Sequence, residues 1–248
     1  MQGPSFVNQD IGLKERLLRV LYDPRTSFAA VYQRETTPDW FIPALLATVV
    51  GVAVYFVTLP IMLDPDSPEL QMQLQALSEE QRQHYLQSMR EFSWIGVPVG
   101  VFSTLVIVGG VLMVLARSLF KSEVTYQQML IVKGYASLVL IPQWILRTFL
   151  VMINDTMVVY TGLGAFVPRD MRQTFEGRVL VAIDCFDFWQ AWVLGIGLAA
   201  MAGVPTKRAL IAVYVLWGLW ILGGATVETI TSALPVPEQV IESTSLEQ

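Results

Sequence analysis

The sequence predicts an all-α integral membrane protein with five transmembrane helices. Of its 248 residues, 54% are apolar and only 15% are charged, whereas a soluble domain usually carries about 25% charged residues. The mean hydropathy is +0.52. The apolar residues also gather in five long runs, each close to the length of about 20 residues that a helix needs to cross a bilayer. No run alternates apolar and polar residues with period two, so the pattern favours helices over a barrel.

The N-terminal segment, residues 1–39, is polar and amphipathic, and we expect it to be cytoplasmic. Residues 10–22 place aliphatic side chains on one helical face and basic side chains on the other, which predicts a helix on the inner leaflet. Asp23 and Pro24 are typical of an N-cap followed by a first-turn proline, and they predict a second short helix. The residues expected to contact inner-leaflet lipid are Lys14, Arg16 and Arg19.

The five spans follow in order, joined by short or structured loops. They are residues 40–63, 94–116, 129–153, 184–202 and 209–230. Between the first two, residues 64–93 form a predicted helical insertion. Ser67 before Pro68 opens one helix there, and Ser78 with Gln81 offers a capping box for the next. The loop 154–183 is interpreted as a turn followed by an interfacial helix, and residues 231–248 as a polar outer tail.

The distribution of lysine and arginine predicts the orientation. One side of the membrane has nine such residues, in the N-terminal segment and in the loops after the second and fourth spans. The other side has five, and the C-terminal tail has none. Because short cytoplasmic loops carry the excess of positive charge, we expect the N-terminus inside and the C-terminus outside.

The sequence has few of the groups that catalysis needs. It has one cysteine, Cys185, and one histidine, His84, so it has no CxxC, HExxH or disulfide framework. No GxSxG or Walker loop is present. A net charge of −5 gives no reason to expect nucleic-acid binding. We therefore expect no enzymatic activity, no cofactor and no metal.

Ionisable residues inside the spans are the candidate functional residues, because a charge near the centre of a membrane helix costs roughly 2.5–3.5 kcal/mol on insertion scales. The predicted topology brings four of them into the outer leaflet, and we expect Arg147 to pair with Asp187. They form either a polar cavity for a headgroup, ion or proton, or a structural clamp, or they reach the interface separately. The four are Arg147, Asp184, Asp187 and Glu228.

Three further features of the spans lead to predictions. Lys133 lies about one turn inside the cytoplasmic boundary, and we expect its ammonium to reach the interface. Pro142 removes a backbone hydrogen bond in the third span and predicts a kink. Small residues repeat every four positions along the fourth span, which predicts close helix packing, within the chain or with a partner subunit. This helix-packing ridge comprises Ala191, Gly195, Ala199 and Gly203.

Several local strings occur in a characteristic order along most of the chain. The Leu-Tyr-Asp-Pro string at 21–24 is followed by Phe28, and Lys-Gly-Tyr-Ala at 133–136 is followed by Pro142. The others are Ile-Asp-Cys-Phe at 183–186 with Trp189, Gly-Ile-Gly-Leu-Ala at 195–199 and Lys-Arg-Ala at 207–209. In this set the sequence resembles the Yip (Ypt-interacting protein) domain family in its bacterial form, over roughly residues 17–224.

The resemblance implies a five-helix membrane domain without known catalysis, in the inner membrane of a bacterial cell. Eukaryotic members contact prenylated Rab-type GTPases, and they have a longer cytoplasmic arm and an Asp-Leu-Tyr-Gly-Pro motif near the N-terminus. Only Tyr22 and Pro24 of that motif remain here, so GTPase binding is not carried over. We expect membrane lipids and other membrane-protein subunits as partners, and a scaffold or accessory role in a larger membrane complex. The alternative is a small lipid or ion transporter or scramblase that uses the cluster around Arg147.

Overall fold

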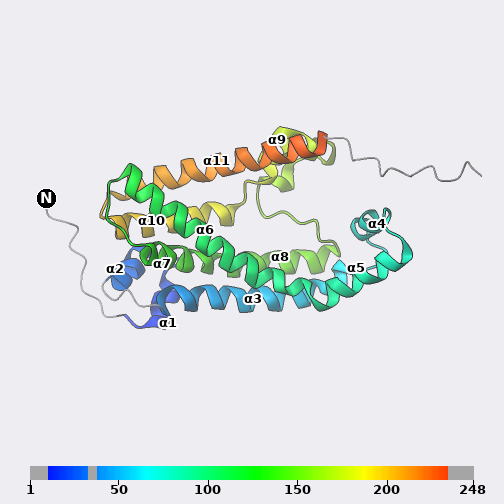
Figure 1. Ribbon diagram of the computed structural model, residues 1–248, viewed down its shortest axis with the longest axis horizontal. Helices are drawn as coiled ribbons and strands as arrows, with labels where there is room; N and C mark the ends of the chain where they lie inside the picture. The colour runs from blue at the N-terminus through cyan, green and yellow to red at the C-terminus, as the bar shows by residue number, and fades with distance from the viewer. Residues whose placement is uncertain (1–10, 33–37, 234–248) are drawn as a thin grey trace, which may run out of the picture.

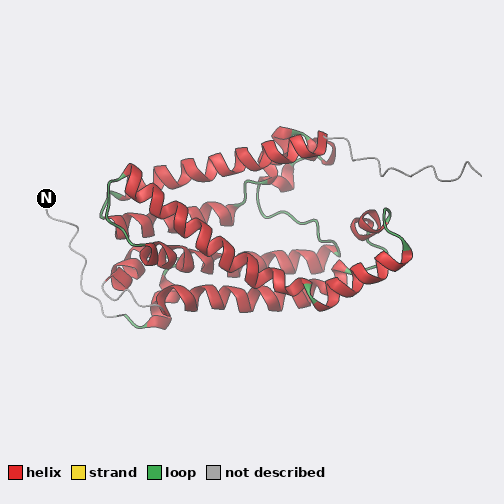
Figure 2. Ribbon diagram, in the orientation of Figure 1, coloured by secondary structure: helices red, strands yellow, loops and turns green. Residues whose placement is uncertain are grey.

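The computed structural model describes residues 11–32 and 38–233, and within them the chain is a bundle of helices without a β-sheet (Figures 1 and 2). The predicted all-α fold is therefore confirmed. Residues 1–10, 33–37 and 234–248 of the predicted N-terminal segment and tail lie outside the described residues. The α-helices are α1 (Leu13–Arg19), α2 (Pro24–Tyr32), α3 (Pro38–Met62), α4 (Pro68–Leu74), α5 (Glu79–Glu91), α6 (Gly96–Leu119), α7 (Tyr126–Ala136), α8 (Leu140–Asn154), α9 (Phe175–Val181), α10 (Cys185–Ala202) and α11 (Thr206–Ala233). Four short 3-10 helices join them: η1 (Ser93–Ile95), η2 (Ser137–Val139), η3 (Leu163–Phe166) and η4 (Arg169–Gln173).

Five helical segments are long and apolar enough to cross a membrane, as predicted. They are Asp39–Met62, Ser93–Leu119, Tyr126–Asn154, Cys185–Ala202 and Thr206–Ser232. Figure 1 shows α1, α2 and the α6–α7 and α10–α11 turns at one end, which we call the basic end. The other end carries α4, α5 and α9, and we call it the hairpin end. The loops therefore alternate between the two ends as expected, while the N-in, C-out orientation stays a prediction.

The third span is interrupted where the proline predicts a kink. Helix α7 ends at Ala136, the 3-10 turn η2 follows, and α8 begins at Leu140. Pro142 has no N–H to donate to the carbonyl one turn earlier, and its ring crowds that carbonyl. The tighter turn ends shortly before the proline, so the regular helix is interrupted near the predicted position, and a kink of the axis there stays a prediction.

Helices α1 and α2 pack onto the bundle, which corrects one sequence prediction. Phe28 is fully buried and its ring lies 5.9 Å from that of Tyr135, centroid to centroid. The indole Nε1 of Trp189 donates to the carbonyl of Leu21 over 3.1 Å. Arg16 is only 5% exposed, so its guanidinium faces the protein and its predicted contact with lipid headgroups is wrong. The sequence pattern places the basic residues of α1 toward the inner leaflet, whereas the tertiary contacts of α1 turn Arg16 inward.

The other two basic residues of α1 remain at the surface. Lys14 is exposed, and Arg19 pairs with Glu15 over 2.7 Å. Their contact with inner-leaflet lipid stays a prediction.

The small-residue ridge of α10 lies mostly inside the chain. Ala191, Gly195 and Ala199 are buried, and a Cβ added at Gly195 would lie 2.6 Å from the Leu210 side chain of α11. This close approach of α10 and α11 fits packing within the chain. Gly203 has a different role, because it ends α10 with a φ of +64°, a conformation that glycine adopts without strain.

Candidate functional site

A groove of about 820 Å³ lies between α6 and α11. Side chains of α6 and α11 form its walls, and side chains of α7, α9 and α10 form its floor and one rim. The surface is mainly aliphatic and aromatic. Six hydrophilic side chains interrupt it: Thr104, Lys133, Arg178, Asp187, Gln190 and Glu228.

Lys133 lies at the floor of this groove and is only 3% exposed. Its ammonium donates to Oε1 of Gln190 over 3.1 Å, and Nε2 of Gln190 donates to the carbonyl of Ala136 over 3.1 Å. The prediction that this lysine reaches the interface is wrong. Helix α7 is buried from Ile131 to Ala136, and the hydrogen bond to Gln190 holds the ammonium inside the bundle.

Asp187 shares the floor with Lys133. It lies in the first turn of α10 and is half-buried, within electrostatic range of Lys133, Arg147 and Asp184. Figure 1 shows that α10 begins partway along the bundle and not at the hairpin end. The carboxylate is therefore recessed between the spans, close to the buried ammonium.

Asp184 caps α10 and is held by its neighbours. Its carboxylate accepts from the amide of Phe186 over 2.8 Å and from the hydroxyl of Thr161. The same residue forms an isolated antiparallel bridge with Gly162. These contacts fold the segment between α8 and α10 back toward the bundle, and they explain why α10 starts where it does.

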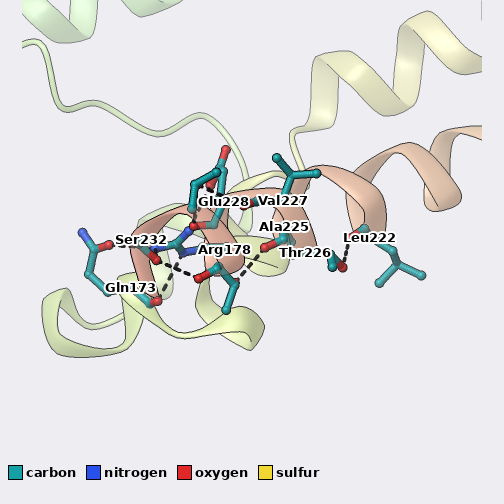
Figure 3. Close-up of polar contacts among 10 residues, drawn as sticks. Gln173, Arg178, Leu222, Ala225, Thr226, Val227, Glu228 and Ser232 are labelled. Atoms are coloured by element: carbon teal, nitrogen blue, oxygen red, sulfur yellow. Dashed lines mark hydrogen bonds and ion pairs between the residues drawn. The ribbon is translucent and has the colours of Figure 1, made fainter. Parts of the chain in front are cut away.

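Glu228 lies at the rim of the groove, beside Arg178 of α9 (Figure 3). Nη1 of Arg178 is 3.9 Å from Oε2 of Glu228, and Nη2 donates to the hydroxyl of Ser232 over 2.9 Å. Nε of Arg178 also donates to the backbone carbonyl of Gln173 over 3.2 Å. This arginine therefore ties α9 to the end of α11.

The four residues of the expected cluster do not form a single site in the structure. Arg147 is exposed on α8, and among residues 11–32 and 38–233 no carboxylate lies within ion-pair distance of it. Only Asp187 and Glu228 line the groove, and Asp184 serves as a cap. Arg147 and Asp187 interact at longer range, and a shared function of the four residues stays a prediction.

A second buried polar group lies at the basic end. Nη2 of Arg16 is 3.1 Å from Oδ1 of Asp39, and the hydroxyl of Tyr135 is 3.4 Å from the same oxygen. Nε and Nη1 of Arg16 are buried and have no hydrogen-bond partner. The sequence offered one signal for this network, an aspartate directly before the first apolar run.

The groove offers charge and hydrogen bonds within an apolar surface. It presents an ammonium, a guanidinium, two carboxylates, an amide and a hydroxyl, which suits noncovalent binding of an amphipathic molecule. Within the described parts of the chain, no three histidine, cysteine, aspartate or glutamate side chains are placed to hold a metal ion.

Comparison with known protein families matches most of the chain. The family model described as Yip1 domain matches residues 18–227, and this range contains α2 to α10 and most of α11. No curated protein and no solved structure matches the chain.

Proposed function

This chain belongs to the Yip1 domain family and is a multi-pass membrane protein, and from that premise we propose that it is a non-catalytic scaffold or accessory subunit of a larger membrane complex. We place this complex in the inner membrane of a bacterial cell. The observation that carries the proposal is the pair α4 and α5, which we call the outer hairpin.

The outer hairpin has several ordering contacts of its own. Ser67 caps α4, and Ser78 and Gln81 form a complete capping box at α5. Nε of Arg82 donates to the carbonyls of Leu74 and Leu77, over 3.1 Å each. These caps and cross-links hold a defined shape before any partner binds.

The bundle gains little packing from this hairpin, which projects beyond the spans (Figure 1). Helix α5 has no buried residue, and Met72 of α4 is 71% exposed. Phe92, at the end of α5, is also exposed. An ordered helix pair that exposes large apolar side chains is a candidate protein-binding surface.

The charge of the hairpin favours a protein partner over the membrane surface. Residues 64–92 contain six acidic side chains and two arginines. An anionic leaflet attracts basic segments and repels acidic ones. A subunit with a basic outer surface is therefore the partner that this hairpin fits.

The alternative function, transport through a cluster around Arg147, has less support from the geometry. Arg147 does not line the groove, and two of the three acids that it was expected to meet have other partners.

Site-specific photo-cross-linking tests the proposal. A photoreactive phenylalanine analogue is placed at Met72 or Phe92 in the native membrane, with Met152 of α8 as a control that is also exposed. We expect one discrete protein adduct from each hairpin position and none from the control. Adducts with lipid alone at Met72 and Phe92 would show that the hairpin lies on the membrane and would refute the proposal.

A further inference from the structure

We infer that the groove between α6 and α11 holds one phospholipid with an aminoethyl-phosphate headgroup. Its phosphate binds at Lys133, its ammonium binds at Asp187, and one acyl chain lies along the apolar walls. This inference is independent of the outer hairpin, which lies at another place on the molecule.

The groove is accessible from the lipid phase. Its wall side chains Ile107, Leu219 and Trp220 are exposed, the last of them 80%, and all three belong to membrane-spanning helices. Its volume of about 820 Å³ falls within the range of roughly 300–1,000 Å³ typical of ligand sites. A lipid can therefore enter sideways from the bilayer without leaving it.

Lys133 supplies the anion site. A lysine ammonium has three N–H donors, and the structure gives a partner to one of them, Oε1 of Gln190. The side chain is almost completely buried but lines the groove. Unsatisfied donors of a buried charge are costly, and a phosphate oxygen in the groove would accept from them.

Asp187 supplies the site for the ammonium of the lipid headgroup. It lies at the same floor, within electrostatic range of Lys133, and no described residue donates a hydrogen bond to its carboxylate. A purely anionic headgroup at Lys133 would be repelled by this carboxylate and by that of Asp184 nearby. A headgroup with a phosphate and an ammonium places the phosphate at Lys133 and the ammonium at Asp187.

The remaining charges near the groove do not compete for the headgroup. Arg178 and Glu228, at the rim, lie beside each other. Arg147 acts on Asp187 only at longer range, from α8. A primary ammonium also fits better than a quaternary one, because only the primary amine has N–H groups to donate to Asp187.

The test is native mass spectrometry of the full chain, purified in mild detergent after incubation with equal amounts of phosphatidylethanolamine, phosphatidylcholine and phosphatidylglycerol. We expect one phosphatidylethanolamine per chain on the wild type. The double variant Lys133→Met/Asp187→Asn removes both charges together, so neither is left unpaired, and its lipid occupancy should fall at least tenfold.

Two adjacent glycines of α11 give a matched control for the apolar part. A Cβ at Gly223 or Gly224 meets nothing within 4 Å, so both sites accept a side chain, but only Gly224 lines the groove. Gly224→Phe should abolish lipid retention and Gly223→Phe should leave it unchanged. Preferential retention of phosphatidylglycerol, a wild type without bound lipid, or equal retention by the two glycine variants would overturn the inference.

Discussion

Replacing Asp39 with leucine removes the carboxylate that pairs with Arg16 at 3.1 Å. The side chains of both residues are buried, with relative exposures of 7% for Arg16 and 2% for Asp39, so the substitution leaves a guanidinium charge inside the protein without this partner. Loss of one partner of a buried ion pair typically costs about 3–5 kcal/mol. We expect the free energy of unfolding of Asp39→Leu to fall by about this amount, and α1 and α2 to detach from the bundle.

The double variant Arg16→Met/Asp39→Leu should recover most of that loss. Two of the three guanidinium nitrogens have no hydrogen-bond partner, so the structure offsets the desolvation of Arg16 only in part. Replacing both members of such a pair with apolar residues of similar size is often neutral or stabilising. The coupling free energy between the two positions should therefore reach at least about 2 kcal/mol.

The assay is equilibrium unfolding of the four proteins of this double-mutant cycle in mixed detergent micelles, followed by tryptophan fluorescence. Limited trypsin digestion at Lys14 reports separately on the release of α1. If Asp39→Leu were destabilised by less than about 1 kcal/mol, or if the two single losses simply added, the pair would not hold α1 on the bundle.

Three further substitutions, the first with a matched control, test the packing and the hairpin. Gly197→Leu should cost about 1–3 kcal/mol, because a Cβ there would lie 2.7 Å from the Phe28 ring. Gly218→Leu is the control and should be tolerated, because a Cβ there meets nothing within 4 Å. Thermal denaturation compares the two variants. Ser78→Ala should cost the hairpin about 1 kcal/mol and speed amide hydrogen exchange in the first turn of α5 while the spans are unaffected. Trp189→Phe should cost roughly 0.5–1.5 kcal/mol because it removes the indole hydrogen bond to the carbonyl of Leu21, between α1 and α2; an unchanged melting temperature would contradict that contact.

The spans, the caps and the interruption of the third span were predictable because each depends on local sequence. Hydrophobic length determines a span, and Ser78 with Gln81 determines a cap within one turn. Pro142 changes the backbone that directly precedes it. None of these features requires knowledge of which helices are neighbours.

The position of the buried charges was not predictable in the same way. Lys133 was placed by its distance from the span boundary, but the burial of α7 and the hydrogen bond to Gln190 decide where its ammonium goes. Arg16 lies on α1, and only the docking of that helix beside Asp39 turns it inward.

The recessed start of α10 likewise depends on long-range contacts. The segment between α8 and α10 folds back through Thr161 and Gly162. This fold places Asp187 near Lys133 in the groove, while Arg147 stays on the outside of α8. The sequence pattern identified the charged residues but not their partners.

The mass of the particle extracted from the native membrane tests the proposed accessory role most directly. The wild type is compared with a variant in which residues 65–91 are replaced by a short glycine-serine linker, and tryptophan fluorescence checks that its spans remain folded. We predict that the wild type migrates as a complex of fixed mass well above its own 27.7 kDa, and that the variant migrates as the free subunit. A wild type found alone, or a variant that keeps the complex, would contradict the assignment.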